Sequence, residues 1–285
     1  MELKKATKKQ VKLRLGLSAV SGGGKTMSAL LLAKGLVGDW DKIAVIDTEN
    51  ESASLYSHIG EYNTIALSPP FTPERYIQAI KTCEDAGMEC IIIDSITHEW
   101  DGKGGILEIH SAMSGNSFTN WSAVTPRHSR FIEAILQSKC HIITTVRRKQ
   151  DYEMTVNDKG KQTPVKVGLK EITREGFEYE LTINFNLDEK HNCTASKDRT
   201  ELFMDQPAFI ITEETGQLIK EWCDSGERVK TEQELINDAC LKLNTSTTID
   251  ELASNWKYIG VNMQSKEACQ VLKDSLKLSL TPQPA

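Results

Sequence analysis

The segment at residues 19–26 holds the residues best suited to do chemistry: three consecutive glycines, then Lys25 and Thr26. Glycines allow successive backbone N–H groups to turn inward around a polyphosphate. The lysine can reach the outer phosphates, and the threonine hydroxyl can bind Mg²⁺. The segment matches G-x-x-x-x-G-K-[ST] except at its first position, where alanine replaces glycine. It predicts a nucleoside triphosphate site formed by Ala19, Ser21, Gly22, Gly23, Gly24, Lys25 and Thr26.

A phosphate-binding loop of this kind needs a strand before it and a helix after it. Residues 11–18 alternate between apolar and polar types, which is typical of a strand, and residues 27–34 are rich in helix formers. Both flanks therefore favour a phosphate-binding loop over the alternative, a glycine-rich structural turn.

Two short apolar runs end in carboxylates, and both runs are typical of buried parallel strands. Residues 43–46 precede Asp47 and Glu49, and residues 90–93 precede Asp94. Because open parallel sheets bind ligands at the carboxyl ends of their strands, we expect these carboxylates near the phosphates. Asp94 occupies the Walker B position, whose carboxylate orients Mg²⁺. The predicted metal ligands are Thr26, Asp94 and Asp47.

Glu49 is the predicted general base, which would polarise the attacking water. Glu99 and Asp101 compete for that role, because both follow the Walker B strand closely. For Asp94 the structural alternative is a side chain that caps the next turn.

With these motifs the chain resembles the RecA-type recombinase superfamily, and in particular the phage-encoded RecA-fold ATPases linked to single-strand annealing and recombination. The resemblance covers roughly residues 10–225 and is carried by residues 19–26, 45–49, 91–95, 142–147 and 195–200. It implies an α/β fold, with a RecA-like P-loop core whose central sheet is parallel and whose edge strands are antiparallel. It also implies that Glu49 is the catalytic glutamate.

In RecA-like proteins the strand after Walker B ends in a sensor of the terminal phosphate, and Thr145 takes that place here. Recombinases usually carry glutamine at this position, so Arg147 and Gln150 are alternatives for the sensor. Lys197 and Arg199 match basic residues that reach the phosphates of a neighbouring subunit, which implies self-assembly with ATP between subunits. A solvated charged turn is the alternative for this pair.

Three related classes of nucleotide-binding protein can be weighed from single positions. Partition-type ATPases carry an additional lysine five residues before the P-loop lysine, where this chain has Val20. An Asn-Lys-x-Asp element of the kind that GTPases use to specify their base is not found in the sequence. A nucleotide kinase stays possible as an alternative, because residues 147–149 could form a phosphate-clamping lid.

Two regions are suited to contact single-stranded DNA. Aromatic residues on loops rich in glycine, serine and asparagine could stack on bases, although packing against the sheet is the alternative. Residues 147–174 carry eight basic against four acidic residues, and residues 151–174 predict a hairpin with a polar turn at 157–160. The resemblance places a DNA-binding loop after this strand; a solvated hairpin is the alternative. The predicted DNA-binding residues are Trp100, Phe118, Trp121, Arg147, Arg148, Lys149, Lys159 and Lys161.

The chain is predicted to divide into an ATPase core at residues 1–226 and a small helical domain at residues 227–285. Within the core, residues 177–186 alternate and predict a half-exposed antiparallel strand. Two capping boxes, at residues 231–234 and 248–251, predict helix starts in the second part. Oligomerisation or partner docking is a hypothesis for that part, and self-packing is the alternative.

Composition narrows the remaining choices. The chain has 285 residues and a formal net charge of −6, so overall electrostatics do not hold it to DNA and any contact must be local. The basic start leads into no apolar segment, and we expect a cytoplasmic protein, in a bacterial host if the gene belongs to a phage. The seven cysteines include no C-x-x-C pair and indicate reduced thiols.

Together these features predict a Mg²⁺-dependent RecA-like ATPase that self-assembles and acts on single-stranded DNA in recombination or replication. The alternative from another class is a nucleotide-controlled binding protein whose ATP site works as a slow switch.

Overall fold

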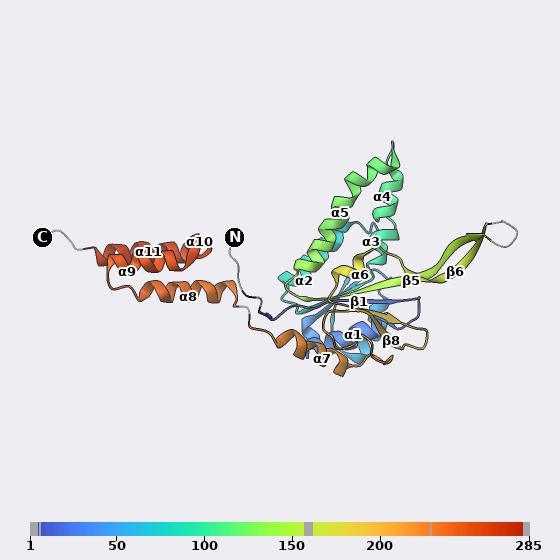
Figure 1. The fold of residues 1–285 in the computed structure, drawn as a ribbon, viewed down its shortest axis with the longest axis horizontal. Helices are drawn as coiled ribbons and strands as arrows, with labels where there is room; N and C mark the ends of the chain where they lie inside the picture. The colour runs from blue at the N-terminus through green and yellow to red at the C-terminus, as the bar shows by residue number, and fades with distance from the viewer. Residues whose placement is uncertain (1–4, 6, 157–161, 229, 282–285) are drawn as a thin grey trace. The chain divides into compact units, whose positions relative to one another are not determined.

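The computed structural model describes residues 5, 7–156, 162–228 and 230–281. It divides into two compact units, one of which comprises Gln10–Gly226 and the other Met1–Lys9 with Glu227–Ala285. Figure 1 shows the larger unit as a sheet between layers of helices. The smaller unit is made of helices.

The sheet of the larger unit has the strand order β3-β2-β4-β5-β1-β7-β8, and β6 pairs with β5 outside this path. Neighbours from β3 to β7 run parallel, whereas β8 is antiparallel to β7 and β6 is antiparallel to β5. The predicted mixed α/β fold with a parallel centre is confirmed. The strands are β1 (Arg14–Ala19), β2 (Ile43–Asp47), β3 (Asn63–Ala66), β4 (Cys90–Asp94), β5 (His141–Val156), β6 (Gln162–Glu171), β7 (Ile183–Leu187) and β8 (Cys193–Asp198).

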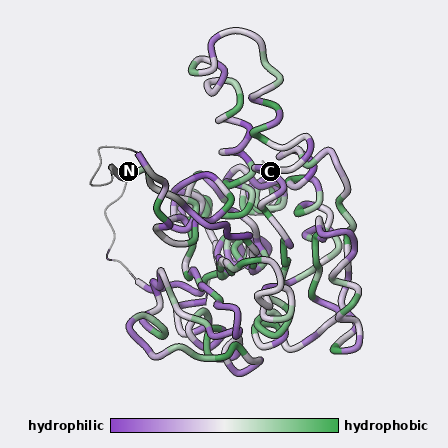
Figure 2. Tube along the Cα trace, turned by 90° about the vertical axis from the view of Figure 1, so that its right-hand side faces the viewer, coloured by the Kyte–Doolittle hydropathy of each residue, from purple (hydrophilic) through white to green (hydrophobic). Residues whose placement is uncertain are grey.

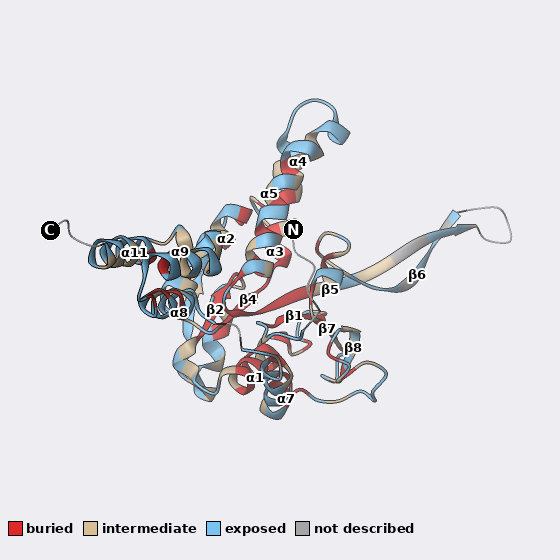
Figure 3. Cartoon of the chain, turned by 60° about the vertical axis from the view of Figure 1, so that its left-hand side comes forward, coloured by how far each residue is buried: buried red, intermediate tan, exposed pale blue. Residues whose placement is uncertain are grey.

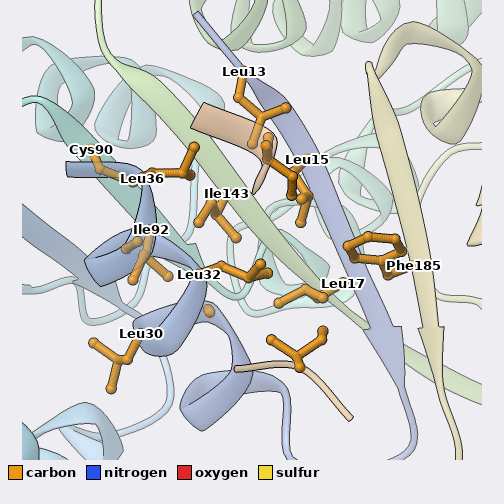
Figure 4. Close-up of a cluster of buried hydrophobic side chains, with 14 of the residues drawn as sticks. Leu13, Leu15, Leu17, Leu30, Leu32, Leu36, Cys90, Ile92, Ile143 and Phe185 are labelled. Carbon is orange, nitrogen blue, oxygen red and sulfur yellow. The ribbon is translucent and has the colours of Figure 1, made fainter. Parts of the chain in front are cut away.

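Helices cover both faces of this sheet, so its central strands are buried on both sides (Figure 3). In β2 the alternate residues Ile43 and Val45 face one core, and Ala44 and Ile46 face the other. The first core contains α1 (Lys25–Val37) and α7 (Glu213–Asp224), and Figure 4 shows how its leucine and isoleucine side chains meet. The second contains α2 (Pro73–Asp85) and α5 (Ser117–Gln137).

The remaining elements of the larger unit are short. They are η1 (Trp40–Lys42), η2 (Ser52–Ile59), α3 (Thr97–Asp101), α4 (Ile106–Ala112) and α6 (Phe177–Glu180). Within the described ranges, no helix combines the length and the apolar character needed to cross a membrane. Figure 2 shows hydrophobic residues interspersed with hydrophilic ones along the trace.

Two strands differ from the sequence-based prediction. β1 begins only at Arg14, and all its residues are buried. Arg14 can be buried because its guanidinium donates to the carbonyls of Leu13, Leu136 and Cys140. The predicted antiparallel strand at residues 177–186 is confirmed only for its second half: Phe177–Glu180 forms α6, and β7 begins at Ile183 and is antiparallel to β8.

β7 starts six residues after α6 begins, and it lies between β1 and β8. Four of its five residues are buried and the fifth is half-buried, so neither face is exposed. Asn184 in β7 is 2% exposed, and its amide donates to Glu171 and Ser196. The alternation of polar residues in this segment therefore reports buried hydrogen bonds and not a solvent-facing side.

The predicted hairpin is present as β5 and β6, whose register runs from the pair Arg148 and Glu171 to the pair Val156 and Gln162. β5 is a single strand that leaves the central sheet and continues into the hairpin (Figure 1). The expected turn at residues 157–160, and with it Lys159 and Lys161, lies outside the described residues.

The smaller unit contains α8 (Glu232–Asn244), α9 (Ile249–Tyr258), α10 (Gly260–Gln264) and α11 (Glu267–Leu280). Thr231 and Glu234 form the predicted capping box at the start of α8. Thr248 caps α9 as predicted, but the Glu251 carboxylate accepts hydrogen bonds from Thr247 instead.

A buried histidine, His141, is expected to make the free energy of unfolding depend on pH. The backbone N–H of Leu13 donates to His141 Nδ1 at 3.0 Å, which requires that nitrogen to be unprotonated. Burial, with Lys12 and Arg14 nearby, lowers the pKa of His141 from 6.5 to about 3. Because the folded state favours neutral histidine, this stabilisation is complete above pH 6.5 and is lost as the pH falls toward 3.

We expect the free energy of unfolding to fall by up to about 1.4 kcal/mol for each pH unit below 6.5. Urea unfolding across this range measures the slope, which should be smaller in His141→Ala than in the wild type. His58→Ala is the matched control, because the His58 side chain is exposed. Equal slopes in wild type and His141→Ala would contradict the assignment.

Candidate nucleotide site

The glycine-rich loop connects β1 to α1, as the sequence predicts. Gly22 and Gly24 have φ values of 80° and 82°, which L side chains rarely adopt, and Gly24 is the N-cap of α1. A Cβ on Gly23 would come within 2.8 Å of the Ala19 Cβ. The loop thus needs its glycines, and the free N–H groups at the start of a helix form an anion site.

Lys25 is nearly buried at the start of α1, with 9% of its surface exposed. Its Nζ donates to the carbonyls of Ala19 at 3.3 Å and Val20 at 3.0 Å, so the lysine lies folded against the loop. Burial lowers the pKa of Lys25, and the charge of Asp94 opposes this shift. A bound phosphate would add the negative charge that favours the ammonium form.

Asp94 joins three elements at the carboxyl edge of the sheet. Its Oδ2 accepts a hydrogen bond from the Thr26 hydroxyl at 2.6 Å, and its Oδ1 accepts one from Thr145 at 2.5 Å. The Thr145 side chain is fully buried, and its hydroxyl donates to Asp94. Thr145 therefore positions this carboxylate in the structure, whereas the sequence analysis predicts it as the phosphate sensor.

One hydroxyl and one carboxylate suit Mg²⁺, which keeps several waters and takes ligands from substrate phosphates. Thr26 and Asp94 are therefore the residues that would hold the metal. The described residues include no group of three or more His, Cys, Asp or Glu side chains that could hold a metal ion.

The Asp47 side chain contacts the loop that follows β2. Its Oδ1 accepts the N–H of Glu49 at 2.6 Å, and its Oδ2 accepts the N–H of Ala53 at 2.7 Å. Both oxygens are committed to the backbone that follows β2, as is common for Asp at turns. Asp47 thus shapes the loop that carries Glu49, and its role as a metal ligand stays a prediction.

Glu49 lies beside the Walker B strand and is held by two side chains. Its Oε1 accepts from Ser95 Oγ at 3.1 Å and from Arg147 Nε at 2.9 Å, and its Oε2 pairs with Arg147 Nη2. Arg147, expected to sense phosphate or contact DNA, therefore forms a bidentate ion pair with the predicted base.

The competing carboxylates lie elsewhere. Glu99 is 1% exposed, and its Oε2 pairs with His128 Nδ1 at 3.0 Å between α3 and α5. Burial raises the pKa of Glu99. Asp101 is exposed at the end of α3 and lines a cavity beside Trp100 and Trp121, described below. No motif marks His128, so the sequence could not reveal this pair.

A cavity of about 400 Å³ adjoins the loop and has room for the remainder of a nucleotide. The His191 ring lies close to Gly24, where an added Cβ would approach it to 3.2 Å. Sequence reasoning missed the apolar and aromatic wall, because its residues come from separate segments with no shared motif. The lining includes Met27, Leu31, Tyr56, His191, Ile210 and Ile211.

Lys197 and Arg199 lie together at the end of β8, where both donate to the carbonyl of Tyr179. Burial, followed by the charge of Arg199, lowers the pKa of Lys197. β8 is the last strand of the sheet order, so this pair is at an edge. Its role toward a neighbouring subunit stays a prediction.

The predicted DNA-binding aromatics separate into two places. Trp100 and Trp121 stack with centroids 6.0 Å apart, and His110 stacks on Trp121 at 4.1 Å. Phe118 is 85% exposed at the start of α5. A cavity of about 670 Å³ adjoins the tryptophans at the foot of the hairpin, the end where β5 leaves the central sheet. Its lining mixes aromatic, basic and acidic residues and includes Trp100, Trp121, Lys149, Lys170 and Arg174, with Asp101, Asp151, Glu171 and Glu175.

Arg148 is turned toward the hairpin, and its Nη2 donates to the carbonyl of Leu169 at 2.9 Å. Lys149 alone of the basic run at residues 147–149 lines the cavity beside the tryptophans. The three side chains thus have separate surroundings, and the kinase lid stays an untested alternative.

Comparison with known protein families agrees with a P-loop assignment. Among solved structures, a KaiC-like protein from the hyperthermophilic archaeon Pyrococcus horikoshii OT3 is similar, with 16% identity, 70% of this chain and 86% of that chain covered, and a TM-score of 0.41. No curated protein matches the chain. The AAA domain family matches residues 11–251, which is most of the sequence. The chain therefore belongs to the AAA domain family.

Proposed function

We propose that this protein binds ATP with Mg²⁺ and hydrolyses it, with Glu49 as general base. The observation that carries the proposal is the convergence of Thr26, Asp94 and Glu49 around the glycine loop, through the contacts of Asp94 with Thr26 and of Ser95 with Glu49. Carboxylates from the ends of β2 and β4 thus meet a hydroxyl from the first turn of α1, where a helix N-terminus would hold phosphate.

Each side chain has a distinct task in this reaction. Lys25 and the loop N–H groups bind and orient the phosphates, while Thr26 and Asp94 would hold the metal. Bound Mg²⁺ would neutralise charge on the phosphates. Glu49 accepts a proton from the attacking water, which general-base catalysis requires at hydrogen-bond distance.

The finer proposal is that the protein acts on single-stranded DNA, as a self-assembled member of the phage recombination or replication ATPases. The stacked Trp100 and Trp121 beside a large cavity at the hairpin foot support it. Because acidic side chains lie among the cations there, we expect base stacking to contribute more to affinity than phosphate contacts. Lys197 and Arg199 would serve the subunit contact.

Single-stranded DNA binding, measured by fluorescence anisotropy with and without an ATP analogue, tests this proposal. We expect Trp121→Ala to weaken binding about tenfold, and Trp121→Phe, which keeps a stacking face, to weaken it less. DNA should also raise the rate of ATP hydrolysis. Absence of binding at low salt in both nucleotide states would reject the DNA function and leave the ATPase proposal standing.

A second candidate is a nucleotide-controlled switch with slow turnover. The ion pair between Arg147 and Glu49 favours it, because a carboxylate held by a guanidinium is a weak base. Turnover that stays negligible with saturating ATP, Mg²⁺ and DNA would support the switch over the ATPase.

A further inference from the structure

Arg147 lies where the nucleotide site and the hairpin meet. It is the register partner of Ala19, the first residue of the phosphate loop. Its N–H donates to Thr97 Oγ1 at 2.9 Å, and its carbonyl accepts the N–H of Ile172, at the end of the hairpin, at 2.8 Å. The backbone is thus fixed by three neighbouring segments, and only the side chain, 36% exposed, has room to move.

The contact between Arg147 and Glu49 opposes catalysis. Two parallel N–H···O bonds make this a bidentate pair, which is stronger and more specific than a single contact. A nearby cation stabilises the ionised carboxylate and so weakens it as a base. Ser95 Oγ also donates to the same Oε1. Glu49 cannot accept a proton from water efficiently while this pair is intact.

A bound triphosphate would compete for the same guanidinium. Arg147 is close enough to Lys25 for its charge to contribute to the lowered pKa of that lysine. Phosphate oxygens match the planar fork of arginine as well as a carboxylate does. The terminal phosphate is the part of ATP that the P-loop lysine reaches, so we expect it to lie near Arg147 as well.

We propose that Arg147 exchanges Glu49 for the terminal phosphate of ATP, so that one side chain both distinguishes ATP from ADP and releases the base. This inference rests on the proposed ATPase function. ADP lacks the third phosphate, so Arg147 stays paired with Glu49, and the carboxylate stays a weak base. The intact pair also opposes ATP binding, because ATP must break it.

A double-mutant cycle tests the exchange, with the affinities of AMP-PNP and ADP measured by isothermal titration calorimetry. Glu49→Gln removes the ion pair and should tighten AMP-PNP about fivefold more than it tightens ADP. Arg147→Gln should lower the preference for AMP-PNP over ADP about tenfold. In the Arg147→Gln background, Glu49→Gln should bring no further gain.

The chain offers a matched control in Arg127 and Glu74, which form the same bidentate pair with both N···O distances at 2.8 Å. Glu74→Gln and Arg127→Gln should leave both affinities unchanged. Arg147→Lys keeps the charge without the planar fork and should give an intermediate preference, which guards against a folding defect in Arg147→Gln.

Two results would overturn the exchange. One is a gain from Glu49→Gln that persists without Arg147, since this would reflect only the field of the carboxylate on the phosphates. The other is an equal loss of AMP-PNP and ADP affinity in Arg147→Gln. If the wild type binds neither nucleotide, the proposed function itself fails, and the exchange fails with it.

Discussion

Glu49→Gln is expected to lower ATP turnover by about two or more orders of magnitude while nucleotide binding is retained. Glutamine has nearly the same shape but cannot accept the proton from water. It can still accept hydrogen bonds from Ser95, whose Oγ is 3.1 Å from the present Oε1. Steady-state phosphate release together with AMP-PNP titration separates the loss of chemistry from any loss of binding.

Glu51→Gln is the control for this variant, because Glu51 lies in the same loop and is exposed. Its turnover should stay within about threefold of the wild type, as is usual for surface substitutions that touch no special feature. Undiminished turnover in Glu49→Gln would show that another group accepts the proton.

Lys25→Ala is expected to weaken ATP binding about 10- to 100-fold and to abolish measurable turnover at moderate ATP concentrations. The lysine supplies charge-assisted hydrogen bonds to the phosphates, and no second basic side chain follows it in the loop. Fluorescent-nucleotide titration measures the affinity, and phosphate release at several ATP concentrations measures the turnover.

Lys34→Ala is the matched control, since Lys34 is in the same helix and donates to the Gly38 carbonyl at its far end. This variant should bind ATP as the wild type does. ATP binding by Lys25→Ala at wild-type strength would exclude residues 19–26 as the phosphate site. Lys25→Ala and Glu49→Gln therefore separate two roles: Lys25 is needed for ATP binding and for turnover, whereas Glu49 is needed for turnover but not for binding.

The sequence by itself determined the parts of this protein that depend on short-range order. Consecutive residue types at positions 19–26 predicted the phosphate-binding loop, since glycine torsions and a helix start are local properties. The apolar runs before Asp47 and Asp94 predicted buried strands, because parallel strands are covered on both faces. The capping box at Thr231 was readable for the same reason.

The tertiary structure alone decided which polar groups meet. Glu49 and Arg147 are 98 residues apart, and no spacing rule links them. Asp47 and Asp94 both end apolar runs, but Asp47 accepts backbone N–H groups of its own loop, whereas Asp94 accepts the hydroxyls of Thr26 and Thr145. Alternation predicted an exposed face for β7, but Asn184 finds its partners inside the protein. Local patterns record what a residue can bind, whereas packing decides which of several possible partners is within reach.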